Sequence, residues 1–278
     1  MMSKLKLIFL AIPLSFIFNV NIHAQSTGML EEVVVTAQKR EESLQDAPIA
    51  ITAITESTID DLDIANVVDL AGMAPNVHII NTPSNNTAAT IAMRGGTTIN
   101  PAITWEPTVG MYLDGVYLGK GQGSIFDVAD LERVEILRGP QGTLYGRNTL
   151  GGAINLISKK PSGAGTSAKV TLGNYGLKQT QLIGDYEIGE NVFTKIVVNN
   201  KKRGGYVNNA ASPYQAAQGV VPNTTSRNTE LDTINSKGVK FTLAYEGDKT
   251  SVNLSLDKTD QDNIPPFAQL TNTIPNWS

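Results

Sequence analysis

The feature that most constrains the fold is an alternation of apolar and polar residues in the last part of the chain. From about residue 165, about five segments alternate with the period of two that a β-strand requires, and each is near the ~10-residue length of a barrel strand. They lie in residues 168–173, 177–187, 192–199, 239–245 and 251–257. The chain is therefore expected to end in a series of antiparallel strands.

The connections between these segments alternate in length. Residues 189–191 and 247–248 are tight turns, whereas residues 204–236 form a long polar stretch rich in Asn, Thr and Ala. Short turns on one side and long loops on the other are typical of outer-membrane barrels. A soluble β-sandwich also buries one face of each strand, so the alternation alone leaves both architectures open.

The N-terminus has the pattern of a secretory signal peptide. Lys4 and Lys6 precede an apolar run over residues 7–18, and Ala24 closes a short segment that fits a cleavage site. The run is shorter than the ~20 residues that a membrane-spanning helix needs. We expect residues 1–24 to be removed. No later stretch of 18 apolar residues exists, so any later membrane crossing must use strands.

Composition excludes several classes of function. The chain has 278 residues, a net charge of −4 and no cysteine, so neither a polyanion such as nucleic acid nor thiol chemistry is indicated. His23 leaves with the signal peptide, and His78 alone cannot build a metal site or a catalytic triad. The sequence predicts no catalytic residues, no metal and no cofactor, and hence no enzyme.

The middle of the chain reads as a compact α+β domain. One or two short amphipathic helices are expected over residues 58–71, and Asp114-Gly115 predicts a type I′ hairpin turn within residues 109–118. A turn of helix is expected at 125–129. The Gly-rich loop at 139–152 lacks the spacing of nucleotide-binding motifs. Strands are expected in residues 49–54, 90–94, 131–138 and 153–158.

The strand at 131–138 carries charge on both faces. Strict alternation places Glu132 with Val134 on one face, and Arg133 with Glu135 on the other. This pattern fits a domain enclosed by a polar wall, because a buried charge requires a partner. A solvated edge strand is the alternative.

Residues 31–37 form a short apolar block in a polar surrounding. Three consecutive valines, Val33 to Val35, strongly favour extended backbone. No adjacent hairpin partner is evident. The block is either an edge strand of the following domain or a strand offered to another protein by β-augmentation.

Several ordered motifs resemble TonB-dependent outer-membrane receptors. Residues 31–37 resemble the TonB box, and Met93-Arg94-Gly95 matches the family's Arg-Gly element. Residues 109–118 and 131–152 are similar to the characteristic plug segments, and residues 155–161 resemble the junction between plug and barrel.

The resemblance implies a small α+β plug domain inside a 22-stranded barrel. The protein would lie in the outer membrane of a Gram-negative bacterium, surrounded by lipid, and would bind an external ligand such as a ferric siderophore. TonB, driven by ExbB and ExbD, would pair with the box as an added strand and rearrange the plug by pulling. No cofactor is implied.

The resemblance also assigns roles to residues. It implies TonB binding by Glu31, Glu32, Val33, Val34, Val35, Thr36 and Ala37. It implies ion pairing between plug and barrel by Arg94, Arg138, Glu132 and Glu135, the two arginines pairing with barrel glutamates. It implies a structural plug motif made of Gly95, Asp114, Gly115, Gly139, Pro140, Gly142, Tyr145 and Gly146.

The expected domain organisation leaves the barrel incomplete. A periplasmic segment at 25–47 follows the signal peptide, the plug covers 48–162, and the first barrel strands cover 163–278. The few residues between a mature N-terminus and the box leave no room for a signalling domain. About five strands would expose unpaired edges to lipid, so we expect a truncated gene, a partial sequence or a split reading frame. A soluble periplasmic TonB-binding module and a non-functional fragment are the alternatives.

Overall fold

The computed structural model describes residues 33–64, 66–82, 85–98, 105–119, 130–208 and 230–264. All of these residues belong to one unit of the chain, Val33–Ser278. The predicted signal peptide and the predicted helical turn at 125–129 lie outside the described residues.

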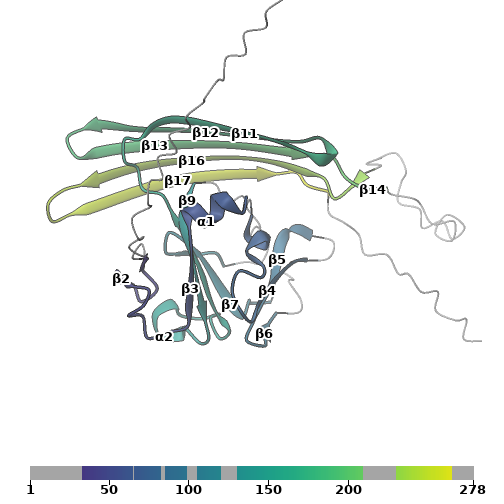
Figure 1. The fold of residues 1–278 in the computed structure, drawn as a ribbon, viewed down its shortest axis with the longest axis horizontal. Coiled ribbons are helices and arrows are strands. Elements are labelled where there is room, and N and C mark those ends of the chain that lie inside the picture. The colour runs from purple at the N-terminus through teal and green to yellow at the C-terminus, as the bar shows by residue number, and fades with distance from the viewer. Residues whose placement is uncertain are drawn as a thin grey trace, which may run out of the picture. The chain divides into compact units, whose positions relative to one another are not determined.

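A mixed five-stranded sheet organises the α+β domain (residues 48–162) in the order β3-β9-β10-β7-β8 (Figure 1). Its β10 runs parallel to β7, and the other pairs are antiparallel. Strand β9, with its charged residues, therefore lies inside the sheet, and the solvated-edge interpretation of residues 131–138 is wrong. The strands are β3 Ile51–Thr55, β7 Val109–Leu113, β8 Val116–Tyr117, β9 Leu131–Arg138 and β10 Gly152–Ser158.

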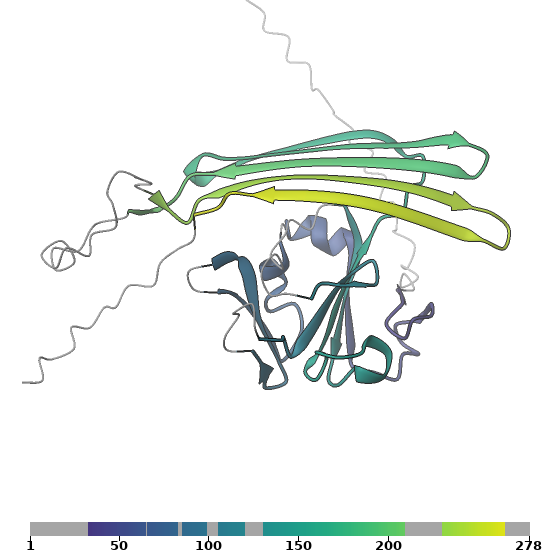
Figure 2. The same cartoon turned by 180° about the vertical axis from the view of Figure 1, so that it is seen from behind.

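One face of this sheet forms the main apolar core. Two short helices and a three-stranded sheet, in the order β4-β5-β6, pack against it (Figure 2). These elements are α1 Glu56–Asp61, η1 Val67–Leu70, β4 Val77–Thr82, β5 Asn85–Met93 and β6 Gly96–Thr97. The residues with no exposed surface in this core include Val67, Leu70, Met93, Val134, Ile136, Ile154 and Leu156.

The two short helices confirm the prediction of one or two helices over residues 58–71. Thr55 caps the first, because its side chain accepts a hydrogen bond from Thr58 N. Asn66 and Asp69 form a capping box at the start of the second.

The predicted hairpin at residues 109–118 is also confirmed. Strands β7 and β8 pair through Tyr112 with Tyr117 and Leu113 with Val116. The turn residues Asp114 and Gly115 both have positive φ, 50° and 82°. A type I′ turn requires positive φ at both central positions, which is why Asp-Gly stands here.

The C-terminal part is a meander of five antiparallel strands, in the order β11-β12-β13-β16-β17. This confirms the predicted series of strands after the α+β domain. The strands are β11 Gly165–Gly173, β12 Leu177–Gly189, β13 Val192–Arg203, β16 Ile234–Glu246 and β17 Ser251–Gln261. Within the stretch predicted as a long loop, β14 Val207–Asn208 pairs with β15 Glu230–Leu231, and β16 begins at Ile234.

The meander has its apolar residues on the outside. In β13, Ile196 and Val198 are 46% and 41% exposed, whereas the alternate residues Lys195, Asn199 and Lys201 are buried. Ladder pairing places the exposed apolar residues of all five strands on the same, outward face. They include Val170, Leu172, Leu182, Tyr186, Ile188, Val239, Tyr245, Val252, Leu254 and Leu256. An apolar outside over a polar inside is typical of strands that face lipid.

No helix among the described residues is long and apolar enough to span a membrane.

Candidate functional site

The block at residues 31–37 continues into a small hairpin. Strand β1, Val34–Val35, pairs with β2, Glu42–Ser43, across a turn at Lys39. The expectation that this block has no hairpin partner is therefore wrong. The partner escapes notice because β2 is only two residues long and polar. Glu31 and Glu32 lie outside the described residues.

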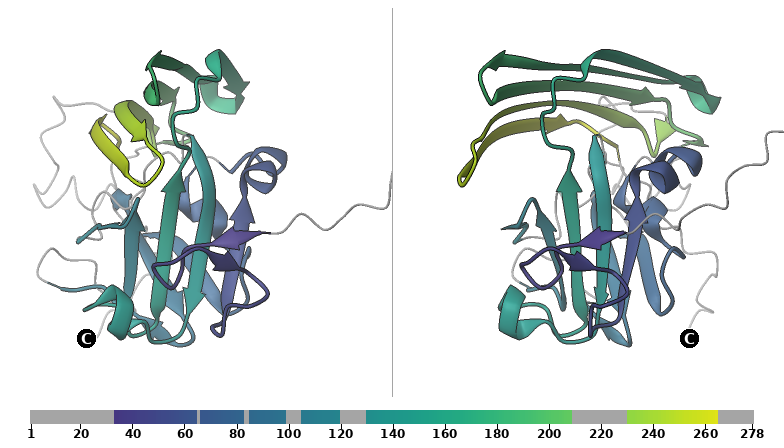
Figure 3. Two further views of the ribbon diagram at one scale, coloured as in Figure 1. Left: turned by 90° about the vertical axis from the view of Figure 1, so that its left-hand side faces the viewer. Right: turned by 60° about the vertical axis from the view of Figure 1, so that its left-hand side comes forward.

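The hairpin is docked on the α+β domain and is not freely exposed. It lies across the sheet face opposite the main apolar core (Figure 3). Val34 is 43% exposed, but Val35 and Ala37 have no exposed surface. The alternation of a strand explains the contrast, since neighbouring side chains point to opposite faces.

A buried carboxylate holds the hairpin in place. Glu135, on the central strand β9, has no exposed surface. Its Oε1 accepts hydrogen bonds from the backbone N of Thr36 at 2.7 Å, from the Thr36 hydroxyl at 3.2 Å and from Arg133 Nε at 2.9 Å. Asn155 Nδ2 donates to the other oxygen at 3.4 Å. A buried charge is tolerated only with such partners.

Aromatic side chains form the rest of the docking surface. Ala37 packs with Tyr112 and Tyr145, whose rings meet edge to face at 4.9 Å. The Lys39 ammonium lies 4.3 Å from the centre of the Tyr145 ring, within range of a cation–π interaction. Burial raises the pKa of Tyr145 well above its ordinary value, and the charge of Glu135 adds to the rise.

The residues predicted to pair charges with the barrel are placed as follows. Glu132 and Glu135 both form ion pairs with Arg133 of their own strand. Neither Arg94 nor Arg138 has an acidic partner in the described part of the chain, and Arg138 Nε is buried without a hydrogen-bond partner. Their pairing with barrel glutamates stays a prediction.

Several of the predicted motif residues lie in turns of the α+β domain. Gly139 has a φ of 106°, and a Cβ there would lie 2.8 Å from Arg94 Nη1, so a side chain would displace that guanidinium. Pro140 is exposed. Gly142 begins the short helix α2, Gly142–Tyr145, and Gly146 ends it with positive φ. Gly95 turns the chain between β5 and β6.

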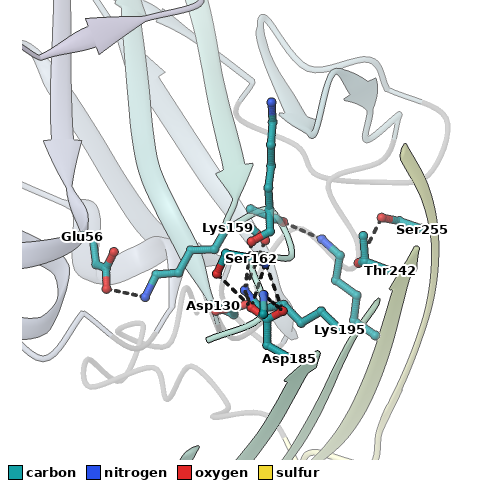
Figure 4. Close-up of polar contacts among 12 residues, drawn as sticks. Glu56, Asp130, Lys159, Ser162, Asp185, Lys195, Thr242 and Ser255 are labelled. Carbon is teal, nitrogen blue, oxygen red and sulfur yellow. Dashed lines mark hydrogen bonds and ion pairs between the residues drawn. The ribbon is translucent and has the colours of Figure 1, made fainter. Parts of the chain in front are cut away.

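A second polar site, which the sequence did not predict, joins the α+β domain to the meander (Figure 4). Lys195 Nζ, on the inner face of β13, lies 3.1 Å from Asp130 Oδ2 and 3.6 Å from Asp185 Oδ2. It also donates to the carbonyl oxygens of Lys159 and Lys160 at 3.4 Å. All three charged side chains are at most 7% exposed. We call Asp130, Asp185 and Lys195 the anchor cluster.

The anchor cluster also fixes the linker between the two parts. The Asp185 carboxylate accepts hydrogen bonds from the backbone N of Ser162 at 3.0 Å and of Gly163 at 2.9 Å, and from the Ser162 hydroxyl at 3.2 Å. Burial raises the pKa of the Asp130 carboxyl, and the Lys195 charge opposes that rise. The linker at Ser162 and Gly163 is therefore held to the meander by hydrogen bonds as well as by the covalent chain.

A third contact is more open to solvent. Lys240 Nζ, on β16, lies 2.9 Å from Asp114 Oδ2, and the two side chains are 20% and 35% exposed. Lys240 also donates to the hydroxyl of Ser158, whose backbone N donates to Asp114 Oδ1 at 2.8 Å. Beside this contact lies a cavity of about 430 Å³. Its lining includes Leu118, Asn199, Ser236, Asp257, Thr259 and Gln261.

Part of the chain is similar in sequence to known proteins. The TonB-dependent Receptor Plug Domain family matches residues 43–153. The chain is 30% identical over 162 residues to the catecholate siderophore receptor Fiu of Escherichia coli K12. The aligned region covers 56% of this chain and 20% of Fiu. It is also 28% identical over 156 residues to the vitamin B12 transporter BtuB of Vibrio vulnificus CMCP6. This aligned region covers 55% of the chain and 24% of BtuB.

Solved structures of such receptors share the fold. The ferric yersiniabactin uptake receptor FyuA of Yersinia pestis superimposes with a TM-score of 0.63 at 19% identity, over 76% of this chain and 31% of FyuA. The pyoverdine receptor FpvA of Pseudomonas aeruginosa gives 0.62 at 18% identity, over 82% of this chain and 30% of FpvA. The matches to Fiu and BtuB span about a fifth to a quarter of those relatives. The relatives are named as receptors and transporters, in agreement with the expectation that the chain is not an enzyme.

Proposed function

We propose, from the premise that this chain carries a TonB-dependent receptor plug domain in residues 43–153, that it serves TonB-dependent uptake across the outer membrane. The chain would supply the coupling strand, the plug and a section of barrel wall. The ligand class is a ferric siderophore or a similarly scarce compound, in line with the names of the relatives. Residues 1–24 would direct export as a cleaved signal peptide.

The observation that carries this proposal is the docked hairpin at the plug. The segment that resembles a TonB box is held by local contacts: two hydrogen bonds from Thr36 to Glu135, one from Arg133 to the Thr36 hydroxyl, two buried side chains and the Lys39–aromatic contact. Each contact is local, so the hairpin can leave without disrupting the main apolar core, which lies on the other face of the sheet. Glu135 sits on β9, so a pull on Thr36 acts on the centre of the plug sheet.

TonB pairing would use the main chain of this hairpin. A strand added to residues 31–37 gains affinity from backbone hydrogen bonds, while alternate side chains give specificity. In the docked form, Val35 is paired with β2 and the Thr36 N–H is bound to Glu135. TonB, with ExbB and ExbD as its source of energy, would therefore engage the box fully only after the hairpin undocks.

The outward apolar face supports a place in lipid. A soluble protein would bury residues such as Leu172 and Leu254, which are 73% and 53% exposed on the meander. Outer-membrane lipid would cover them, as it covers the outer face of other membrane barrels. The soluble periplasmic module is the weaker candidate for the same reason.

The test removes the coupling strand from the complete gene product. Deletion of residues 31–37 should abolish uptake of the ligand by cells while leaving ligand binding at the surface intact. A finer variant is Val34→Pro, which removes a backbone N–H at an exposed position, with Val34→Thr as the matched control that keeps a β-branched side chain. Uptake that persists in the deletion variant would refute the coupling role.

Fractionation tests the alternative. Recovery of the folded protein from the periplasm in soluble form would favour a free TonB-binding module over a membrane receptor. Recovery with the outer membrane, in a form that only detergent extracts, is the expected result.

A further inference from the structure

The inner face of the meander carries two charged contacts to the plug in successive rows. Across the ladder, Lys195 pairs with Thr242, and Val197 pairs with Lys240. The anchor cluster therefore occupies one inward row, and the Asp114–Lys240 pair occupies the next, about 7 Å along the strands. The two contacts are neighbours, but they differ in burial and in number of bonds.

The anchor row is the firmer of the two. Lys195 is 7% exposed and lies near two carboxylates and two carbonyl oxygens. Asp185 accepts hydrogen bonds from three donors, the backbone N and hydroxyl of Ser162 and the backbone N of Gly163. Separation here would leave buried charges without partners, which is strongly unfavourable. The covalent linker also runs through this row.

The next row is easier to open. Asp114 and Lys240 are partly exposed, and partly exposed ion pairs contribute little and are screened by salt. Asp257 lies directly opposite Lys240 in the ladder between β16 and β17. Residues opposite each other in an antiparallel pair have Cβ atoms only ~4.5–5.5 Å apart, so Asp257 can receive the Lys240 ammonium when Asp114 withdraws.

The cavity of about 430 Å³ continues from this row along the same inner face. Its wall on the strand side includes Asp257 of the same row and polar residues of the following rows: Asn199, Ser236, Thr259 and Gln261. Leu113, Leu118 and Leu131 line the cavity on the side of the α+β domain, so its walls are mixed in polarity.

We propose that Lys240 is a gate residue with two positions. It pairs with Asp114 while the plug is closed against the strands, and it passes to Asp257 when the plug separates. The cavity then widens into a passage between the β7–β8 hairpin and strands β13, β16 and β17, while the anchor cluster keeps the plug attached. This inference rests on the proposed uptake function, because it names where the plug would open.

The test compares two matched cysteines on one strand. Ser236 and Thr242 lie on the inner face of β16, each 6% exposed, with Ser236 at the cavity and Thr242 in the anchor row. The chain has no native cysteine, so Ser236→Cys and Thr242→Cys each report one position. The rate of reaction with a small neutral maleimide is measured on the complete gene product in isolated outer membranes.

Second substitutions then test the transfer of Lys240. Asp114→Asn should speed the labelling of Ser236→Cys about two- to fivefold, because it weakens the closed position. Asp257→Asn should slow it by a similar factor, because it removes the open position. Labelling of Thr242→Cys should stay unchanged in both. Asp260→Asn, the same change on the outward face of β17, is the control and should have no effect.

Two results would overturn the proposal. One is a faster reaction in both the Asp114→Asn and the Asp257→Asn variants, which would mean general loosening. The other is an equal change at both cysteines, which would mean that the two rows open together. The assay needs neither TonB nor uptake, so its failure is distinct from failure of the deletion test for energy coupling.

Discussion

The plug sheet and the strand meander are built from strands of the same alternating type, yet they bury opposite residues. In the plug, Val134, Ile136 and Leu156 have no exposed surface. In the meander, Ile196 and Val198 face outward while Lys195 is buried. The plug hides its apolar face from water behind helices and a second sheet. The apolar face of the meander lies on the outside, so its polar residues face the plug.

The difference teaches that alternation identifies a strand without saying what each face meets. Water covers the outside of a soluble domain, and lipid covers the outside of a membrane barrel. The contacts between the two regions are therefore polar, because the inward polar side chains of the meander need polar partners on the plug. Four substitutions test the comparison, in order of decreasing expected effect.

The largest effect is expected where the two regions meet. Lys195→Met leaves Asp130 and Asp185 buried without their cation, which should lower the free energy of unfolding by about 3–5 kcal/mol. Urea unfolding of the purified protein in detergent measures it. Lys240→Met is the control, expected to cost below about 1 kcal/mol because its pair is partly exposed. If both variants lost the same free energy of unfolding, the anchor cluster would be no stronger than the Asp114–Lys240 pair.

A cavity in the plug core should have the next largest effect. Leu156→Ala removes a fully buried side chain between packed layers and should cost about 2–5 kcal/mol. The same substitution at Leu254, which is 53% exposed on the meander, should cost clearly less in the same urea titration. A loss at Leu254 as large as that at Leu156 would contradict the assignment of the outward face.

A charge on the outward face should be unfavourable only in lipid. Ile196→Arg should cost up to about 2–4 kcal/mol when the protein folds into lipid vesicles, with the largest value near the bilayer midplane. In the tight turn after β12, Glu190→Arg should have little effect. If Ile196→Arg folds into vesicles as well as the parent chain, the outward face does not contact lipid.

The smallest effect is expected at the docked hairpin. Thr36→Val keeps the β-branched shape but removes the hydroxyl that donates to Glu135 and accepts from Arg133. The expected cost is about 1 kcal/mol, which corresponds to roughly fivefold faster hydrogen exchange of the amides in residues 33–37. Val34→Thr, at an exposed position, serves as the control. Unchanged exchange in Thr36→Val would show that the hydroxyl does not hold the hairpin.

Local features of the sequence predicted much of the fold. Alternation located the five meander strands, and Asp114-Gly115 located the hairpin turn, because both depend on residues close together in the chain. The position of β9 inside the sheet could not be predicted, since its neighbours β3 and β10 are set by long-range pairing. The β2 partner of the box was missed because two polar residues carry no strand signal.

By itself, the sequence determined the order of the parts: an apolar N-terminal run, a segment that resembles a TonB box, an α+β domain with family motifs, and alternating strands. The tertiary structure alone decided which charges meet. Thr36 reaches Glu135 across 99 residues, and Lys195 reaches Asp130 from a strand of the other region. Residue types and spacing specify local backbone, whereas the partner of a buried charge depends on which distant segments the packed fold brings within hydrogen-bond distance.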